Sequence, residues 1–201
     1  MVKIRWLGHA CYEISCGDFT LITDPYEDES VPGLGKLRLR ADAVYCSHAH
    51  HDHNFSAAVT LSGRTAPADF SLEEFTCAHD DCGGQKRGMN TVRIFRFGTC
   101  RVAHLGDLGE YPSAEILAAL QGVDAMLIPI GGFYTIDSQT AKAIVEAVKP
   151  RCVLPMHYRS ERFGFDMLQE LADFTDTPAR AECEVALPAE GVIALTPAML
   201  I

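Results

Sequence analysis

Residues 48–53 of the chain read His-Ala-His-His-Asp-His and contain four of its eight histidines. Imidazole and carboxylate are the side chains that zinc and similar divalent ions prefer as ligands. Because these side chains are adjacent on one tight loop, they can converge on an ion at little cost in chain entropy. The preceding apolar run, Ala43–Ser47, is typical of a buried strand. The cluster is therefore predicted to be a metal site on the loop that leaves this strand, and not a solvated polar loop.

Other side chains that can bind a metal follow apolar, strand-like runs in the same way. They are Asp24 after Phe19–Thr23, His79 after Phe75–Ala78, His104 after Cys100–Ala103 and His157 after Cys152–Met156. Open sheets place their ligand sites at the carboxyl ends of strands. We therefore expect these residues to line one edge of the folded chain.

The elements that must position these residues change in character along the chain. Strands come first, with alternation at Val2, Ile4 and Trp6 and a Gly17-Asp18 turn between Tyr12–Ser15 and Phe19–Thr23. Further segments are a loop over 27–35, a short helix over Ser56–Leu61, and strands over Thr91–Phe97 and Ala125–Ile130. Helices are expected after the capping residues Ser113 and Asp137, and a third through Met167, Leu168, Leu171 and Phe174. With no repeat or linker, residues 1–201 are predicted to form a single domain with sheets covered by helices.

The composition excludes several classes of protein. Hydrophobic residues make up 48% and charged residues 22% of the 201 residues, as in soluble globular proteins. The chain begins MVKIRWLGHA, without the pattern of a secretion signal, and no apolar run approaches the roughly 20 residues of a membrane helix. We therefore expect a cytoplasmic protein that does not bind membranes. The net charge of 17 − 27 = −10 disfavours nucleic acid as a partner. The eight cysteines include no CxxC pair and are expected to be reduced packing residues.

The motif HxHxDH, at His48, His50, Asp52 and His53, resembles the signature of the metallo-β-lactamase superfamily. His79, Asp107 and His157 follow in the order and at the spacing of that family. The wider string HDDCGGQKRGMN, HLGDLG, PIGGFYTID and PMHY is similar to a small bacterial and archaeal branch of metal-dependent hydrolases, and more distantly to ascorbate-6-phosphate lactonase. The resemblance implies a mixed α/β (α+β) fold, the four-layer αββα metallo-β-lactamase sandwich.

The same resemblance implies a dinuclear metal site. In it, His48, His50 and His79 would hold one ion, Asp52, His53 and His157 the other, and Asp107 would bridge them. Zn²⁺ is favoured for both ions, with Mn²⁺, Ni²⁺ or Fe²⁺ as alternatives. Two such ions, about 3.5–4 Å apart, would share a hydroxide that acts as the nucleophile. Asp52 and Asp107 would thereby serve catalysis. The two carboxylates and the hydroxide would leave the site with a charge of about +1, which suits an anionic substrate.

Several further residues are candidates for supporting or substrate-binding roles. Asp24 resembles the family carboxylate that orients a metal-bound histidine, with a turn-forming Asp as the alternative. His104 would support the site or donate a proton to the leaving group, or be structural. His9 and Tyr134 would reach the pocket, Tyr134 otherwise being a packing aromatic. Arg159 or the Lys86-Arg87 pair would bind a substrate anion, with surface ion pairing as the alternative.

These features predict a metal-dependent hydrolase that acts on a small ester, lactone or phosphodiester. The alternatives are an iron-dependent redox enzyme of the sulfur dioxygenase type on the same fold, or a noncatalytic metal-binding protein. The short interval between Asp107 and His157 leaves no room for the insert of nuclease relatives. The chain also lacks accessory segments around the pocket, which predicts a small, exposed pocket or one completed by a homo-oligomer.

Overall fold

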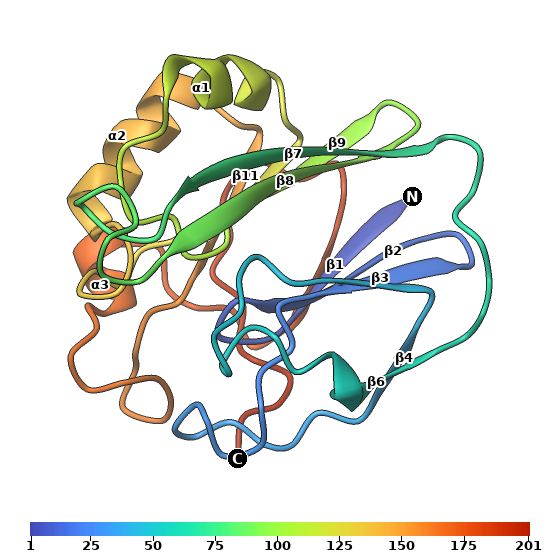
Figure 1. Cartoon of the computed structure of the whole chain (residues 1–201), viewed down its shortest axis with the longest axis horizontal. Coiled ribbons are helices and arrows are strands. Elements are labelled where there is room, and N and C mark those ends of the chain that lie inside the picture. The colour runs from blue at the N-terminus through green and yellow to red at the C-terminus, as the bar shows by residue number, and fades with distance from the viewer.

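The computed structural model describes residues 1–201, and its two main sheets face each other as layers (Figure 1). The first sheet has the order β12-β1-β2-β3-β5. Its strands are β1 (Val2–Gly8), β2 (Cys11–Cys16), β3 (Phe19–Thr23), β5 (Ala43–Tyr45) and β12 (Glu184–Ala186). Because β2 runs antiparallel to both β1 and β3, and β5 parallel to β3, the carboxyl ends of β1, β3 and β5 share one edge.

The second sheet has the order β13-β11-β10-β9-β8-β7. Its strands are β7 (Phe70–Ala78), β8 (Met89–Phe97), β9 (Cys100–His104), β10 (Ala125–Pro129), β11 (Cys152–Met156) and β13 (Gly191–Val192). The strand β8 is antiparallel to β7 and β9, whereas β10 is parallel to β9 and β11. The carboxyl ends of β7, β9, β10 and β11 therefore also share one edge.

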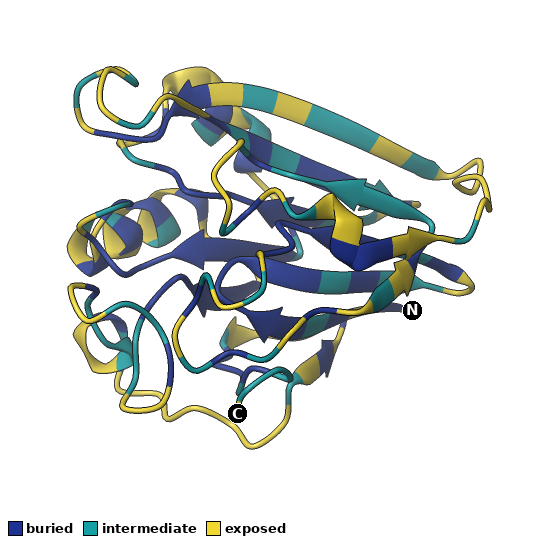
Figure 2. Cartoon of the chain, turned by 60° about the horizontal axis from the view of Figure 1, so that its bottom comes forward, coloured by how far each residue is buried: buried dark blue, intermediate teal, exposed yellow.

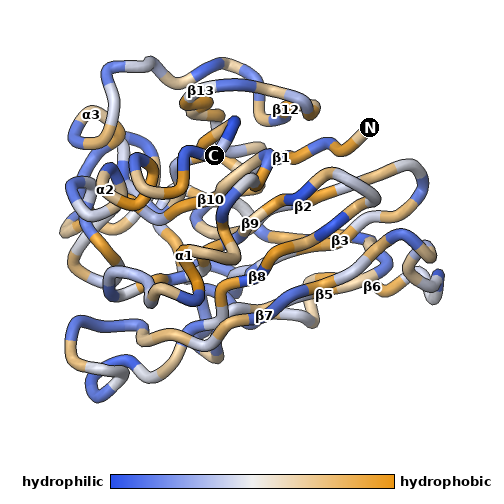
Figure 3. The backbone as a smooth tube through the Cα atoms, turned by 90° about the horizontal axis from the view of Figure 1, so that it is seen from above, coloured by the Kyte–Doolittle hydropathy of each residue, from blue (hydrophilic) through white to orange (hydrophobic).

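The core lies between the two sheets, where their apolar faces meet (Figure 2). Phe19 of the first sheet packs against Phe70 and Phe97 of the second, with ring centroids 5.1 and 6.5 Å apart. The opposite face of the first sheet carries alternating polar residues such as Lys3 and Glu13, which are exposed or half-buried. This period-2 alternation is what a sheet with one solvated face requires. In Figure 3, strands such as β1 and β2 carry hydrophilic stretches between hydrophobic ones, as this alternation requires.

The helices lie beside the second sheet (Figure 1). Helix α1 (Ala114–Leu120) begins at Ser113, whose hydroxyl accepts a hydrogen bond from the Ile116 amide. Helix α2 (Ser138–Val148) begins at Asp137, whose carboxylate accepts one from the Thr140 amide, and its apolar face packs on β10. Both predicted caps are confirmed. The mixed α/β class is confirmed as well.

Two predicted helices differ from the structure. Residues 56–61 form one 3-10 turn (Ser56–Ala58) followed by strand β6 (Val59–Leu61), because β6 pairs in parallel with β4 (Leu39–Ala41), a strand that the sequence pattern did not predict. The third helix is reduced to α3 (Leu171–Phe174). Backbone hydrogen bonds from Gln169 to Gly131 and from Arg159 to Gln169 hold the preceding segment as a loop.

Strands β12 and β13, at the outer edges of the two sheets, were also not predicted. They are three and two residues long, too short to show a clear period. No helix of this structure combines the length and apolar character that crossing a bilayer requires.

Candidate metal centre

The candidate site lies where the carboxyl ends of strands from both sheets meet. From the first sheet come His9 after β1, Asp24 after β3 and the 47–53 loop after β5; from the second come His79 after β7, Asp107 after β9 and His157 after β11. All seven residues predicted as metal ligands are brought together here. This placement follows from the shared direction of the strands that precede them.

One cluster is formed by His48, His50 and His79, each of which offers a ring nitrogen within 4.8 Å of the others. The loop that carries His48 and His50 turns back on itself, since the His53 amide donates to the His50 carbonyl at 2.9 Å. His50 is exposed, whereas the side chains of His48 and His79 are nearly buried. These are the three residues predicted to hold the first ion.

A second cluster unites Asp52, His53 and His157 with a fourth residue, His9. The Nε2 atom of His9 lies 3.3 Å from Oδ2 of Asp52, and its ring centroid lies 3.9 Å from that of His157. His9 has a left-handed backbone (φ 54°), which directs its carbonyl toward the Trp6 indole and the His157 amide. The predicted contact of His9 with the site is therefore present.

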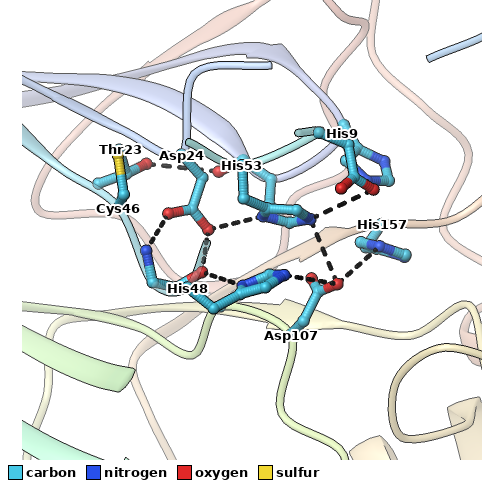
Figure 4. A network of polar contacts seen from close by, with 12 residues as sticks. His9, Thr23, Asp24, Cys46, His48, His53, Asp107 and His157 are labelled. Atoms are coloured by element: carbon cyan, nitrogen blue, oxygen red, sulfur yellow. Dashed lines mark hydrogen bonds and ion pairs between the residues drawn. The ribbon is translucent and has the colours of Figure 1, made fainter. Parts of the chain in front are cut away.

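Asp107 lies between the two clusters (Figure 4). Its Oδ2 atom is 3.2 Å from Nε2 of His53 and of His157, 3.4 Å from Nε2 of His79 and 4.0 Å from Nε2 of His48. One carboxylate oxygen thus faces histidines of both clusters. This is the position that a bridging ligand requires.

Two histidines are oriented by a buried carboxylate behind them (Figure 4). Asp24 accepts a hydrogen bond from Nδ1 of His53 at 2.9 Å, and also from the amide and hydroxyl of Ser47, both at 2.6 Å. The Ser47 oxygen lies 2.9 Å from Nδ1 of His48. With Nδ1 occupied as donor, each ring presents Nε2 to the site, as metal-binding histidines do. The predicted orienting position of Asp24 is therefore found, with Ser47 as an intermediary that the sequence did not suggest.

Asp107 is held in place from the second sheet. Its amide donates to Oδ1 of Asn90 at 2.9 Å, and Nδ2 of Asn90 donates to the Leu105 carbonyl at 2.9 Å. Gly106, with φ 54°, passes so close to Asn90 that a Cβ atom would lie 2.3 Å from its Oδ1. Only glycine fits this approach. Asn90 is thus a supporting residue that sequence reasoning missed.

The structure favours the structural alternative for His104 over a role in catalysis. Its Nε2 donates to the Ala10 carbonyl at 2.9 Å, and its Nδ1 accepts from the Gly106 amide at 3.2 Å. Both ring nitrogens are therefore used within the fold, and the side chain is buried between the sheets. His104 connects the β1–β2 turn to the loop that carries Asp107 and does not face the pocket.

Burial and charge shift the pKa values of the site in opposite directions. Burial, followed by His53, lowers the pKa of His48 to about 3, and burial with the nearby His157 lowers that of His9 to about 4. Burial would raise the pKa of Asp107, but the adjacent His157 and His53 prevail and hold it well below its usual range. Burial would lower the pKa of His53, yet Asp107 and Asp24 raise it well above its usual value. The ionised carboxylates of Asp24 and Asp107 thus stabilise a positive charge, such as that of a cation, among the histidine rings.

The donor set fits a metal. Eight buried side-chain nitrogen or oxygen atoms lack a hydrogen-bond partner, and seven of them belong to this site. They are both ring nitrogens of His9, Nε2 of His48 and His53, Nδ1 of His79 and His157, and Oδ1 of Asp107. Unsatisfied buried polar atoms are costly and rare. Among them, Nε2 of His48, Nε2 of His53 and Oδ1 of Asp107 are atoms that a bound metal ion would satisfy.

A cavity of about 320 Å³ opens onto the clusters. Its lining includes His50, Asp52, His79 and Asp107, together with His51, Arg87, Tyr134 and Phe165. Tyr134 is half-buried, with its ring centroid 6.5 Å from that of His157, so the structure places it where it was predicted.

Arg159 does not line this cavity, and the structure gives it the surface ion pair that was the alternative to substrate binding. Its Nε donates to the Leu168 carbonyl at 2.8 Å, and its Nη1 lies 2.8 Å from Oε1 of Glu170. The left-handed backbone of His157 (φ 53°) breaks the strand geometry two residues before Arg159. Spacing from His157 therefore says little about the direction of this side chain.

Comparison with known proteins identifies the family. The Beta-lactamase superfamily domain matches residues 3–157. A UPF0173 protein from Pyrococcus furiosus is 30% identical over 182 residues, covering 78% of this chain and 83% of the relative. A UPF0173 metal-dependent hydrolase from Thermococcus onnurineus is 30% identical over 194 residues, covering 80% of this chain and 86% of the relative.

Solved structures agree. A protein of the metallo-beta-lactamase superfamily from Thermotoga maritima superposes with a TM-score of 0.72 at 25% identity, covering 97% of this chain and 98% of that one. Igni18, a metallo hydrolase from Ignicoccus hospitalis, shares the fold with a TM-score of 0.63 at 21% identity, covering 84% and 85%. The resemblance stated from the motifs is confirmed: the chain belongs to the β-lactamase superfamily, among the UPF0173 metal-dependent hydrolases.

Proposed function

We propose that this chain binds two divalent cations and hydrolyses a small, anionic ester, lactone or phosphodiester. The observation that carries the proposal is the position of Asp107, whose Oδ2 lies 3.2 Å from His53 and His157 and 3.4 Å from His79. A carboxylate oxygen shared by two histidine clusters is suited to joining two ions. Zn²⁺ suits this His and Asp donor set best, and Mn²⁺, Ni²⁺ and Fe²⁺ also accept it.

The proposed ligands divide as the clusters do. His48, His50 and His79 would hold one ion, Asp52, His53 and His157 the other, with Asp107 between them. When bound, the ions would supply a water of lowered pKa as nucleophile and a Lewis acid for the oxygen of the scissile bond.

The chain's own residues would set the conditions for this chemistry. Asp24 and Ser47 keep Nε2 of His53 and His48 directed at the site. Asp52 and Asp107 supply negative charge, and their pKa values are lowered because the nearby histidines outweigh the effect of burial. With only these two carboxylates among the proposed ligands, two divalent ions keep positive charge on the face that meets the substrate, which favours an anionic substrate. Neither a serine nor a cysteine nucleophile is needed.

The test begins with the metal-free protein, loaded in turn with Zn²⁺, Mn²⁺, Ni²⁺ and Fe²⁺ and analysed for bound metal per chain. Each form is then assayed on three classes of substrate: phosphodiesters with a 4-nitrophenyl leaving group, thioesters, and lactones. We expect two ions per chain and hydrolysis of at least one class. His50→Ala should lose metal and hydrolysis together, whereas Asn54→Ala, an exposed position near the end of the same loop, should keep both. Full activity of His50→Ala would contradict the proposal.

The iron-loaded form decides the redox alternative. If only anaerobically loaded iron supports turnover, and turnover consumes oxygen with a sulfur substrate, the chain is an oxygenase and the hydrolase proposal is wrong.

A further inference from the structure

The loop between β7 and β8, residues 80–88, is folded around one buried side chain, and we refer to it as the Asp80 loop. The Asp80 carboxylate accepts hydrogen bonds from the amides of Cys82, Gly84, Lys86 and Arg87, at 2.8–2.9 Å. Because four amides converge on one side chain that is 1% exposed, the loop has a defined conformation. Its anchor immediately follows His79, so the loop is tied to the candidate metal centre.

Arg87 projects from this loop onto two aromatic rings. Its guanidinium carbon lies 5.5 Å from the ring centroid of Tyr134 and 5.9 Å from that of Phe133, which is the range of cation–π contacts. Phe133 is 61% exposed and has a left-handed backbone (φ 56°), an unfavourable conformation for a bulky residue. Strain of this kind concentrates at functional sites. The strained residue carries an exposed ring, and the guanidinium of Arg87 stacks against that ring.

The guanidinium of Arg87 forms no ion pair and no hydrogen bond with the chain. Its neighbour Lys86 is paired with Asp81 at 3.0 Å, and Arg159 is paired with Glu170 at 2.8 Å. An arginine that is half-buried and held in position, yet has its donors free, is ready to bind an anion.

Arg87 also stands at the junction of two cavities. It is the sole arginine or lysine that lines the cavity of about 320 Å³ over the metal-ligand clusters. It also lines the adjoining cavity of about 840 Å³, whose other charged residues are Lys86, Asp80, Asp81, Glu110 and Asp137. Within the smaller cavity, Arg87 is therefore the one side-chain cation available to an anionic group of a substrate.

We propose that Arg87 is the specificity residue of the pocket, which binds a second oxyanion, a carboxylate or a phosphate, on the substrate. This inference rests on the proposed function, because the scissile bond must lie at the metal centre. The substrate is then a small ester or lactone with an anionic group separated from the cleaved bond by a short carbon chain. The rings of Tyr134 and Phe165 line the cavity and offer that chain an apolar surface.

Three probes of matched length test the proposal by calorimetric titration of the zinc-loaded protein. Butyrate carries one anionic group, glutarate adds a second carboxylate, and 4-phosphonobutyrate adds a phosphonate instead. We expect the second anionic group to tighten binding at least about tenfold, since charge-assisted hydrogen bonds are of that strength. The probe with the larger gain tells whether the natural group is a carboxylate or a phosphate.

Variants of the Asp80 loop show which residue causes the tighter binding of the probes with a second anionic group. Arg87→Met should abolish the preference for the second anion, and Arg87→Lys should retain part of it. Lys86→Met, which removes the same charge one position away, should leave the preference intact. Bound zinc should equal that of the wild type in every variant. An unchanged preference in Arg87→Met, or none in the wild type, would overturn the proposal.

The outcome is separable from that of the proposed function. If the zinc-loaded protein hydrolyses none of the assay substrates, the hydrolase proposal fails. The dissociation constants of glutarate and 4-phosphonobutyrate, each divided by that of butyrate, still decide whether Arg87 binds the second anion.

Discussion

The pocket has two regions that are built in opposite ways. Its floor, which consists of Asp24, Ser47, His53, Asn90 and Asp107, is at most 3% exposed and is cross-linked by hydrogen bonds of 2.6–2.9 Å. Its rim, which consists of Arg87, Phe133, Tyr134 and Phe165, is half-buried or exposed and is held by ring contacts. Buried polar groups must be satisfied, whereas exposed ones have water. The floor is therefore held by buried hydrogen bonds, whereas the rim is held by ring contacts and is open to solvent.

This difference separates two tasks. Changes to the floor should alter metal binding and the chemical step together, because each of its residues orients another. Changes to the rim should alter which substrate binds, with the metal content unchanged. Variants that act on one region at a time test this separation.

The largest effect is expected for Asp107→Ala. The variant removes the carboxylate that faces both clusters, so we expect kcat/KM to fall on the order of 10³-fold, with one ion retained. Kinetics on the best substrate and metal analysis of the same sample measure both quantities. Asp69→Asn, which changes an exposed carboxylate outside both cavities, serves as the control. Two bound ions with undiminished turnover would show that Asp107 does not bridge the two ions.

Asp24→Ala should have the next largest effect, and it acts from behind the site. Without Asp24, Nδ1 of His53 and the amide and hydroxyl of Ser47 lose their acceptor. We expect zinc affinity to fall about 10–100-fold. Competition with a chromogenic chelator measures it. Ser47→Ala removes only the contact to His48 and the hydroxyl contact to Asp24, and should cost less. Equal affinities for Asp24→Ala and the wild type would contradict an orienting role.

The metal-ligand candidates could be predicted from the sequence because much of the information is local. His48, His50, Asp52 and His53 lie on six consecutive residues, and the others follow recognisable strands. The supporting contacts are different. Asn90 reaches Asp107 from the start of β8, and nothing in the order of residues near Asn90 indicates its partner. The one available signal was an amide residue at the beginning of an apolar strand.

The arginines illustrate the limit on the rim. Closeness to His157 in sequence favoured Arg159, whereas Arg87 reaches the pocket only because Asp80 folds its own loop and Phe133 is held nearby. Tertiary pairing likewise overrode local pattern at β6, where Val59–Leu61 became a strand beside Leu39–Ala41. Contacts between distant segments decide such cases.

His104 tests the boundary of the floor, because it supports the site without facing it. His104→Gln should lower the free energy of unfolding by about 1–3 kcal/mol at pH 7, since the Ala10 carbonyl and Gly106 amide lose partners of the right geometry. Burial lowers the pKa of His104 below its ordinary value of 6.5. Below pH 6.5 the unfolded chain therefore binds a proton that the folded chain does not, and the wild type loses stability as the pH falls.

His104→Gln should show a shallower loss of stability between pH 6.5 and 5, because the titrating group is gone. Urea unfolding of the metal-free protein at several pH values measures the slope. The zinc-loaded variant should keep the pH profile of kcat, since the residue transfers no proton in turnover. A shifted kcat profile would restore His104 as a proton donor.

The smallest effect is expected for Arg159→Gln. The ion pair with Glu170 is half-exposed, so its loss should cost at most about 1 kcal/mol of stability. The guanidinium also donates to the Leu168 carbonyl, and a double-mutant cycle with Glu170→Gln separates the two contributions. If Arg87 and not Arg159 binds the anion, the glutarate affinity and kcat/KM of Arg159→Gln should match the wild type, in contrast to those of Arg87→Met. A loss of glutarate affinity in Arg159→Gln, with the metal content unchanged, would extend the rim to the 158–170 segment and make anion binding a property shared by two loops.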